Sequence, residues 1–250
     1  MIDERSAYRI EGDLFGQMRV TDQKLAIDRL LAPVVPVDIL CIGLNYKEHA
    51  TETGATVPAN PMVFMKPSTA LNNPGDPIYI PRRSEQIDYE AELAVIIGKT
   101  GKYIPRDRAM EYVFGYTCAN DVSARDWQRN RDLGGGQFTR GKGFDGFCPL
   151  GPWIVTRDEL PDPGNLRIRT LLNGQVMQDN TTADMIFDVP ALIESLSSTM
   201  TLRAGSIILT GTPQGVGFAR TPPVFMRDGD HVAIEIEKIG RLENPVRREG

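Results

Sequence analysis

The chain lacks the patterns that mark several common classes of protein. It contains no run of 18 or more apolar residues, so the sequence predicts no membrane-spanning helix. Its formal net charge is -5 and no block of lysine or arginine occurs, which argues against a nucleic-acid-binding protein. The first residues are acidic and polar and do not resemble a secretory signal, so we expect a cytoplasmic protein.

The chain also contains few cysteines and lacks two common hydrolase motifs. The 3 cysteines lie far apart without a CxxC pair, which is more typical of buried free thiols than of disulfides or a zinc site. Neither GxSxG nor HExxH occurs, so serine-hydrolase and zinc-peptidase chemistry have no support. A formal GxGxxG match begins at Gly141. It follows a glycine-rich loop, and Pro149 blocks the helix that a dinucleotide site needs.

Glycine and proline, in contrast, are abundant, with 24 and 18 residues in a chain of 250. They interrupt the chain often and therefore predict many short strands and turns instead of long helices. Residues 1–38 predict a small lead-in that packs on the rest, with short strands at 8–10 and 17–20 and a short helix at 25–31. Residues 39–250 are expected to form the main domain.

The most informative stretch is an apolar strand predicted at 88–98, which carries Glu90 and Glu92. Alternate residues of a strand point to the same side, so the two carboxylates lie together, roughly 7 Å apart along the chain. Carboxylates directed together from an apolar strand lose hydration and repel each other, and a bound cation relieves both costs. The alternative is the solvated face of an edge strand, where glutamate is common.

A third carboxylate, Asp121, follows another apolar strand at 113–119. No histidine or cysteine accompanies the three acids, which favours Mg²⁺, Mn²⁺ or Ca²⁺ over zinc. Three carboxylates leave about three octahedral positions for water or for a chelating substrate.

A short helix is predicted to begin at Asn45, which is a good N-cap residue. His49 and Glu52 are three residues apart on it and share a face. A carboxylate beside an imidazole fixes one tautomer and raises its basicity, as in the base and orienting residue of hydrolytic sites. The alternative is a surface pair that stabilises the helix only slightly. The loop at 58–61 is long enough to act, with the helix, as a lid.

Arg125 and Gln128 are three apart in a helix predicted after Asp121, so they face the same side. The planar guanidinium fork matches a carboxylate, and an arginine beside an acidic metal site therefore suggests an anionic substrate. The alternative is a surface contact between Arg125 and Asp126.

Two further polar residues lie beside glycines. Lys142 is predicted in a loop at 133–143, where it is either solvated or able to stabilise developing negative charge. Thr212 follows a buried strand at 206–210, in a glycine-rich turn that can offer its hydroxyl group and backbone N–H groups to a carboxylate.

Taken together, these motifs resemble the fumarylacetoacetate hydrolase (FAH) family, in the family's order and over about residues 39–240. The matching pieces are Gly43-Leu44-Asn45-Tyr46 with His49-Ala50 and Glu52, Phe64-Met65-Lys66-Pro67, Asp88-Tyr89-Glu90-Ala91-Glu92-Leu93, Asn120-Asp121-Val122-Ser123-Ala124-Arg125-Asp126, Gly141-Lys142, and Gly211-Thr212-Pro213 with Gly215-Val216-Gly217.

The resemblance implies a β-rich α+β fold, a mixed β-sandwich roll with a few short helices, in which residues 39–250 form an FAH-like catalytic domain. It also implies a homodimer. The implied cofactor is Mg²⁺ or Mn²⁺, or Ca²⁺ in a crystal, bound by Glu90, Glu92 and Asp121.

The same resemblance implies the roles of the other site residues. His49 and Glu52 would activate water on a mobile lid, and Lys142 would stabilise an enolate. The residues implied to hold the oxo-acid end of the substrate are Arg125, Gln128 and Thr212.

No counterpart of the namesake enzyme's large N-terminal domain precedes the motifs, so the resemblance is to short members such as the FAH domain-containing type 2 proteins. Our leading hypothesis is a metal-dependent hydrolase that cleaves a C–C bond in a β-dicarbonyl 2-oxo acid of the acylpyruvate or fumarylpyruvate type. The alternatives are an oxaloacetate decarboxylase, a hydroxymuconate-type diacid isomerase, and a non-catalytic protein that binds metal and oxo acids. The expected partner is a small dicarboxylate or oxo acid, with no nucleic acid and no membrane.

Overall fold

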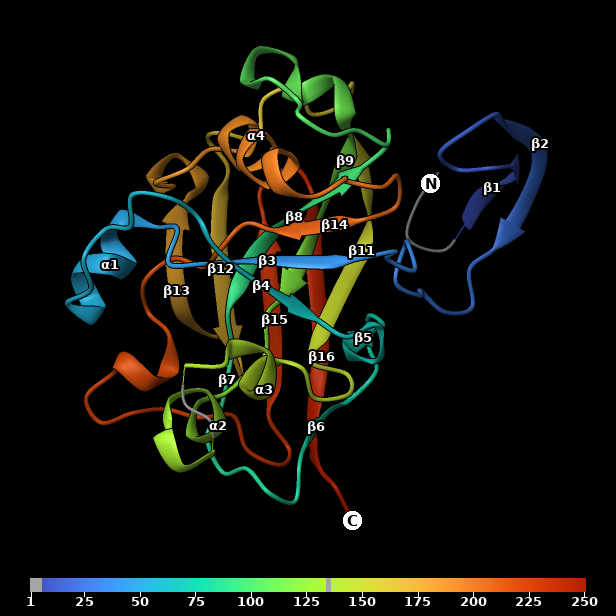
Figure 1. Cartoon of the computed structure of the whole chain (residues 1–250). Coiled ribbons are helices and arrows are strands. Elements are labelled where there is room, and N and C mark those ends of the chain that lie inside the picture. Colours follow the sequence, from blue (N-terminus) through green and yellow to red (C-terminus); the bar gives the residue numbers. More distant parts are fainter. Residues whose placement is uncertain (1–5, 134–135) are drawn as a thin grey trace.

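Two β-sheets packed against each other form the body of the protein (Figure 1). The computed structural model describes residues 6–133 and 136–250. The larger sheet has seven strands in the order β4–β3–β14–β8–β9–β11–β5. Its strands are β3 (Ile39–Gly43), β4 (Met62–Lys66), β5 (Leu71–Asn72), β8 (Ala91–Ile97), β9 (Val113–Asn120), β11 (Cys148–Thr156) and β14 (Ile207–Leu209).

The second sheet has five strands in the order β13–β12–β15–β16–β6. Asn173 and Gly174, both with positive φ, form the tight turn between its first two strands, as an Asn-Gly hairpin requires. Both sheets are mixed, because β16 pairs with β6 in parallel and β14 pairs with β3 in parallel. The five strands are β6 (Ile78–Ile80), β12 (Arg167–Leu172), β13 (Gln175–Thr181), β15 (His231–Ile236) and β16 (Gly240–Arg248).

Strand β8 lies in the middle of the larger sheet, and all seven of its residues are buried. Leu93 and Val95 belong to the main hydrophobic core, which also contains Ile234 of the second sheet. Ala94 and Ile96 belong to a separate cluster. Because successive side chains of a strand point to opposite faces, Glu92 shares the face of Ala94 and points away from the second sheet.

Helices are short and few. The longest, α4 (Val189–Thr199), is capped by Asp188, whose side chain accepts a hydrogen bond from the N–H of Ala191. Its apolar face closes one end of the main core (Figure 1). The other helices are α1 (Lys47–Thr53), α2 (Arg125–Arg129) and α3 (Phe138–Lys142), with 3₁₀ turns η1 (Ser68–Ala70), η2 (Arg106–Tyr112), η3 (Arg131–Leu133), η4 (Thr182–Asp184) and η5 (Gly217–Ala219).

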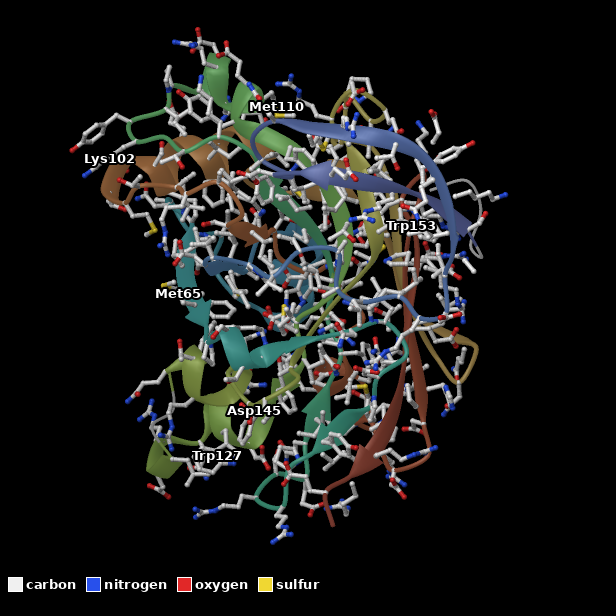
Figure 2. All side chains as sticks on the ribbon, turned by 90° about the vertical axis from the view of Figure 1, so that its right-hand side faces the viewer. Met65, Lys102, Met110, Trp127, Asp145 and Trp153 are labelled. Carbon is white, nitrogen blue, oxygen red and sulfur yellow. The ribbon has the colours of Figure 1, made fainter. Side chains whose placement is uncertain are left out.

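The N-terminal segment forms a hairpin of β1 (Ser6–Gly12) and β2 (Met18–Ala26) that stands beside the body (Figure 1). Figure 2 looks onto this side of the molecule, where Trp153 is labelled. The short helix predicted at 25–31 is wrong, because β2 continues to Ala26, which pairs with Ser6. The ring of Phe15 contacts Phe114 edge to face at 5.3 Å and links the hairpin to β9.

The β-rich fold class with few short helices is confirmed. Short strands β7 (Ile87–Asp88) and β10 (Ser123–Ala124) pair with each other and complete the fold. Over the described residues, no helix reaches the length and hydropathy that a membrane span requires.

Candidate active site

The pairing of β8 with β9 brings the three carboxylates together. Ala91 at the start of β8 lies opposite Asn120 at the end of β9, so Glu90 and Asp121 are neighbours just beyond this pair. The N–H of Asp121 donates to the carbonyl of Glu90 over 2.9 Å. Oxygen atoms of Glu90, Glu92 and Asp121 all lie within 4.8 Å of one another, and all three residues are buried.

The predicted strand at 88–98 is shorter in the structure, because β7 ends at Asp88 and β8 begins at Ala91. At the break, the N–H of Ala91 donates to the side chain of Gln178. Glu90 therefore precedes the strand and Glu92 lies within it. The side chain of Asn120 accepts the N–H of Glu90, which fixes the backbone at the turn.

Neighbouring charges shift the pKa values of the two buried glutamates in opposite directions. Burial opposes ionisation of Glu90, but Lys142 and Arg125 outweigh it and lower the pKa of this carboxyl to about 2. Burial raises the pKa of Glu92 well above its usual value, and the negative charges of Asp121 and Glu90 raise it further. In the absence of a metal, Glu90 is ionised and Glu92 favours its protonated form.

Two buried lysines form ion pairs with Glu90 and Asp121. Lys142 Nζ lies 2.7 Å from Glu90 Oε2 and 2.6 Å from Asp121 Oδ2. Lys66 Nζ lies 2.6 Å from Asp121 Oδ1 and also donates to the carbonyls of Val122 and Phe147. Burial alone would lower the pKa of Lys142, but Asp121 and Glu90 raise it above its ordinary value.

Lys142 was predicted in a loop, and this is wrong: it is the last residue of α3. Its neighbour Gly141 packs against α2 so closely that a Cβ there would lie 2.7 Å from the backbone nitrogen of Gln128. The absence of a side chain at Gly141 therefore allows α3 to approach α2 and directs Lys142 to the carboxylates. Residues 134–135 of the predicted loop lie outside the described residues.

The guanidinium of Arg125 is held by side chains of the protein. Its Nε donates to Asp88 over 2.9 Å, its Nη2 donates to Glu90 over 2.7 Å, and its Nη1 donates to Gln128 over 2.8 Å. Asp88 also accepts the N–H groups of Gly217 and Phe218. Arg125 and Gln128 therefore come together as predicted, but both are tied into an internal network.

His49 and Glu52 form the predicted pair on α1, with Nδ1 of the imidazole 3.0 Å from Glu52 Oε2. Glu52 Oε1 accepts the N–H of Gly215 over 2.8 Å, which fixes the carboxylate. A carboxylate at Nδ1 holds the proton there and leaves Nε2 as the basic atom of the ring. The geometry is that of a base and its orienting residue.

Asn45 does not cap this helix, contrary to the sequence prediction. The N-cap residue is Tyr46, and it makes no side-chain cap hydrogen bond. The amide of Asn45 donates instead to the carbonyls of Phe187 and Thr210 and accepts the N–H of Phe187. It ties the start of α1 to the segment before α4 and to the end of β14.

Thr212 reaches the site from the turn after β14. Its hydroxyl oxygen accepts a hydrogen bond from Gln178 Nε2 over 2.8 Å, so the hydroxyl proton can be donated to a ligand. The N–H of Gly211 donates to Glu92 over 2.6 Å. This turn thus contributes both a hydroxyl group and a backbone donor.

Several of the residues described above line a cavity of about 400 Å³. His49, Glu90, Arg125, Gln128, Lys142 and Thr212 line it, together with Arg129, Phe64, Phe138 and Phe218 among others. A larger hollow of about 1000 Å³ lies elsewhere, around Trp153 and Arg169, and contains none of the predicted site residues. We assign the site to the smaller cavity because Glu90, one of the three clustered acids, lines it together with the imidazole of His49.

The donor set fits a hard divalent cation. All three acids supply oxygen, which suits Mg²⁺ or Mn²⁺. Among the described residues no ion pair involves Glu92, so a cation beside it would supply the charge that lets this buried carboxyl ionise. Lys142 shares two of the carboxylates and must give way in part when an ion binds.

Sequence reasoning missed the roles of Lys66, Asp88 and Gln178. Lys66 and Asp88 lie inside motifs that carried the family resemblance. A charged residue next to a run of apolar residues was the available signal, because charged side chains are rarely buried unless they are paired. Nothing local marks Gln178, whose amide bridges Ala91 to Thr212.

A β-sandwich roll that brings three buried carboxylates together, near a carboxylate-oriented histidine, defines a class of proteins with a candidate site for a divalent cation. The family model described as "Fumarylacetoacetate (FAA) hydrolase C-terminal" matches residues 38–247. The chain belongs to the fumarylacetoacetate hydrolase family.

Several of its relatives and structural neighbours have enzyme names. The chain is 50% identical over 218 residues to "Oxaloacetate tautomerase fahd2, mitochondrial" of Xenopus laevis, covering 87% of this chain and 68% of that protein. It is 45% identical over 239 residues to a fumarylacetoacetate hydrolase domain-containing protein 2 homolog of Dictyostelium discoideum, covering 91% and 78%. A 2-hydroxyhepta-2,4-diene-1,7-dioate isomerase from Mycobacterium marinum superposes with a TM-score of 0.86 at 43% identity, covering 98% of this chain and 88% of that one.

Proposed function

We propose that the protein is a metal-dependent tautomerase that interconverts the keto and enol forms of oxaloacetate or a closely related 2-oxo acid. The observation that carries the proposal is that His49 and Glu90 line one cavity, and Glu90 belongs to the cluster of three acids, so a base and the edge of a cation site face the same bound molecule. The names of the relatives support this reaction, since they include an oxaloacetate tautomerase and a dienedioate isomerase.

The protein's own groups suffice for the proton transfers. Nε2 of His49 removes a proton from the carbon next to the oxo group, and the imidazolium that forms, stabilised by Glu52, returns this proton to the enolate oxygen to give the enol. Lys142 lies beside Glu90 and Asp121, where it can stabilise the oxygen that becomes negative. The hydroxyl of Thr212 donates to the substrate's carboxylate. A bound Mg²⁺ or Mn²⁺ would supply Lewis-acid polarisation of the 2-oxo acid.

The decay of enol-oxaloacetate, followed by its ultraviolet absorbance with and without Mg²⁺, tests the proposal. We expect acceleration by the wild type and a loss of about 10²- to 10⁴-fold in His49→Ala, the usual contribution of a general base. His231→Ala is the matched control, because His231 lies exposed at the start of β15 and is the other histidine of the chain. Wild-type protein with Mg²⁺ that leaves the decay rate unchanged would overturn the proposal.

The second candidate is hydrolysis of a C–C bond in an acylpyruvate or fumarylpyruvate, which the His49–Glu52 pair favours because such a pair can also activate water. A panel of acylpyruvates in ¹⁸O-labelled water separates the reactions. Hydrolysis places the label in the acid product, and decarboxylation releases CO₂ without it. Tautomerisation of oxaloacetate without turnover of the panel supports our first proposal.

A further inference from the structure

Helix α2 presents two arginines to the cavity, and they differ in what holds them. Arg125 and Arg129 are four residues apart and therefore share a face of the helix. Both line the cavity. The charge of Arg125 is matched by Asp88 and Glu90, at 2.9 and 2.7 Å. Arg125 is therefore neutralised from within the protein.

Arg129 has no such acid. Within residues 6–133 and 136–250, no carboxylate forms an ion pair with it, and the side chain is exposed. Its guanidinium lies 4.6 Å from the centre of the Phe218 ring, and that of Arg125 lies 4.5 Å from the same ring. Because Arg125 is already paired with acids of the protein, Arg129 is the one of these two arginines that is left to pair with an anion in the cavity, which Phe218 also lines.

We infer that Arg129 binds the distal carboxylate of a 2-oxo diacid and thereby selects diacids over 2-oxo monoacids. The inference rests on the proposed function, because the acidic residues and Thr212 are taken to hold the oxo-acid end. The planar fork of Arg129 is suited to a carboxylate, and its stacking on Phe218 limits the side-chain freedom that binding must remove.

Isothermal titration of the Mg²⁺-loaded protein with oxaloacetate and with 2-oxobutanoate tests the inference. The two ligands have the same oxo-acid end, and a methyl group replaces the distal carboxylate in the second. We expect the wild type to bind the diacid about tenfold to a hundredfold more tightly, the range of a charge-assisted hydrogen-bonded pair. Arg129→Gln should lose this preference and keep its affinity for 2-oxobutanoate, and Arg129→Lys should retain part of it.

The matched control is Arg131→Gln. Arg131 is exposed, carries the same charge two positions further along, and does not line the cavity. A diacid preference that survives in Arg129→Gln, or that Arg131→Gln lowers equally, overturns the assignment of Arg129 and leaves the proposed function in place. A wild type that binds neither ligand with Mg²⁺ overturns the proposed function, and the assignment falls with it.

Discussion

Lys142 and Glu90 form a buried ion pair, with Nζ of the lysine 2.7 Å from Glu90 Oε2. The same ammonium group lies 2.6 Å from Asp121 Oδ2, so a cation of the protein lies among the oxygens that suit a metal ion. Removal of one partner of a buried pair leaves the other uncompensated in a medium of low polarity. The stability of the metal-free protein and its metal affinity are therefore coupled through Lys142.

Lys142→Met should destabilise the metal-free protein by about 3–5 kcal/mol, because Glu90 and Asp121 lose a shared cation. Mg²⁺ should then restore more stability than it adds to the wild type, since it replaces the missing charge. Urea unfolding with and without Mg²⁺ measures both effects. Lys102→Met is the control, because Lys102 is exposed and lies at the opposite end of the molecule from Trp127 of α2 (Figure 2). Equal unfolding midpoints of Lys142→Met and wild type without metal would contradict this coupling.

Glu92 and Glu90 should respond differently to replacement by glutamine. The raised pKa of Glu92 favours the neutral form, which glutamine imitates, so Glu92→Gln should leave metal-free stability within about 1 kcal/mol of the wild type. Glu90→Gln should cost about 3–5 kcal/mol, because Arg125 and Lys142 lose a buried anion. Both variants should weaken Mg²⁺ binding about tenfold or more.

Chemical denaturation of the two metal-free variants measures their stabilities. Calorimetric titration with Mg²⁺ measures their metal affinities. A Glu92→Gln variant that binds Mg²⁺ as tightly as the wild type would remove Glu92 from the metal site. Equal destabilisation by both substitutions would contradict the opposite charge states assigned to the two glutamates.

Local pattern was sufficient to predict the strands that carry the carboxylates. β8 and β9 are short apolar runs, and their register then places Glu90 beside Asp121. β16 gave no such pattern, because it contains Pro245 and several charged residues. Its place is specified by pairing with β15, the strand directly before it, and with β6, which lies far away in the sequence.

The acids and the His49–Glu52 pair could be named from sequence because spacing within one element determines which side chains share a face. The hydrogen-bond and ion-pair partners of the polar side chains could not be predicted from sequence. Asn45 has the sequence of a helix cap but bonds to Phe187 and Thr210, both more than 140 residues away. Arg125 was predicted to face the substrate, and only the folded structure reveals that Asp88 and Glu90 already hold it.

Mg²⁺ binding should release up to one proton from Glu92, at any pH where this carboxyl still holds its proton. Burial raises its pKa above the usual glutamate value, whereas Glu90, with a pKa of about 2, is already ionised. The ion binds the carboxylate form, so apparent Mg²⁺ affinity should rise with pH, by about tenfold per pH unit below the pKa of Glu92. Calorimetric titration in buffers of different ionisation enthalpy counts the protons. A binding heat that is independent of buffer, or a Glu92→Gln variant with the same pH dependence, would refute this assignment.

Glu52→Gln should lower kcat about tenfold to a hundredfold with little change in Mg²⁺ affinity, because Glu52 acts through His49 and contacts none of the three acids by a hydrogen bond. Glutamine can keep one hydrogen bond, to His49 or to Gly215, but it removes the negative charge that makes Nε2 basic. Glu48→Gln is the matched control, since Glu48 is exposed on the same helix. Equal losses in the two variants would show that charge on α1, and not the contact with His49, supports the reaction.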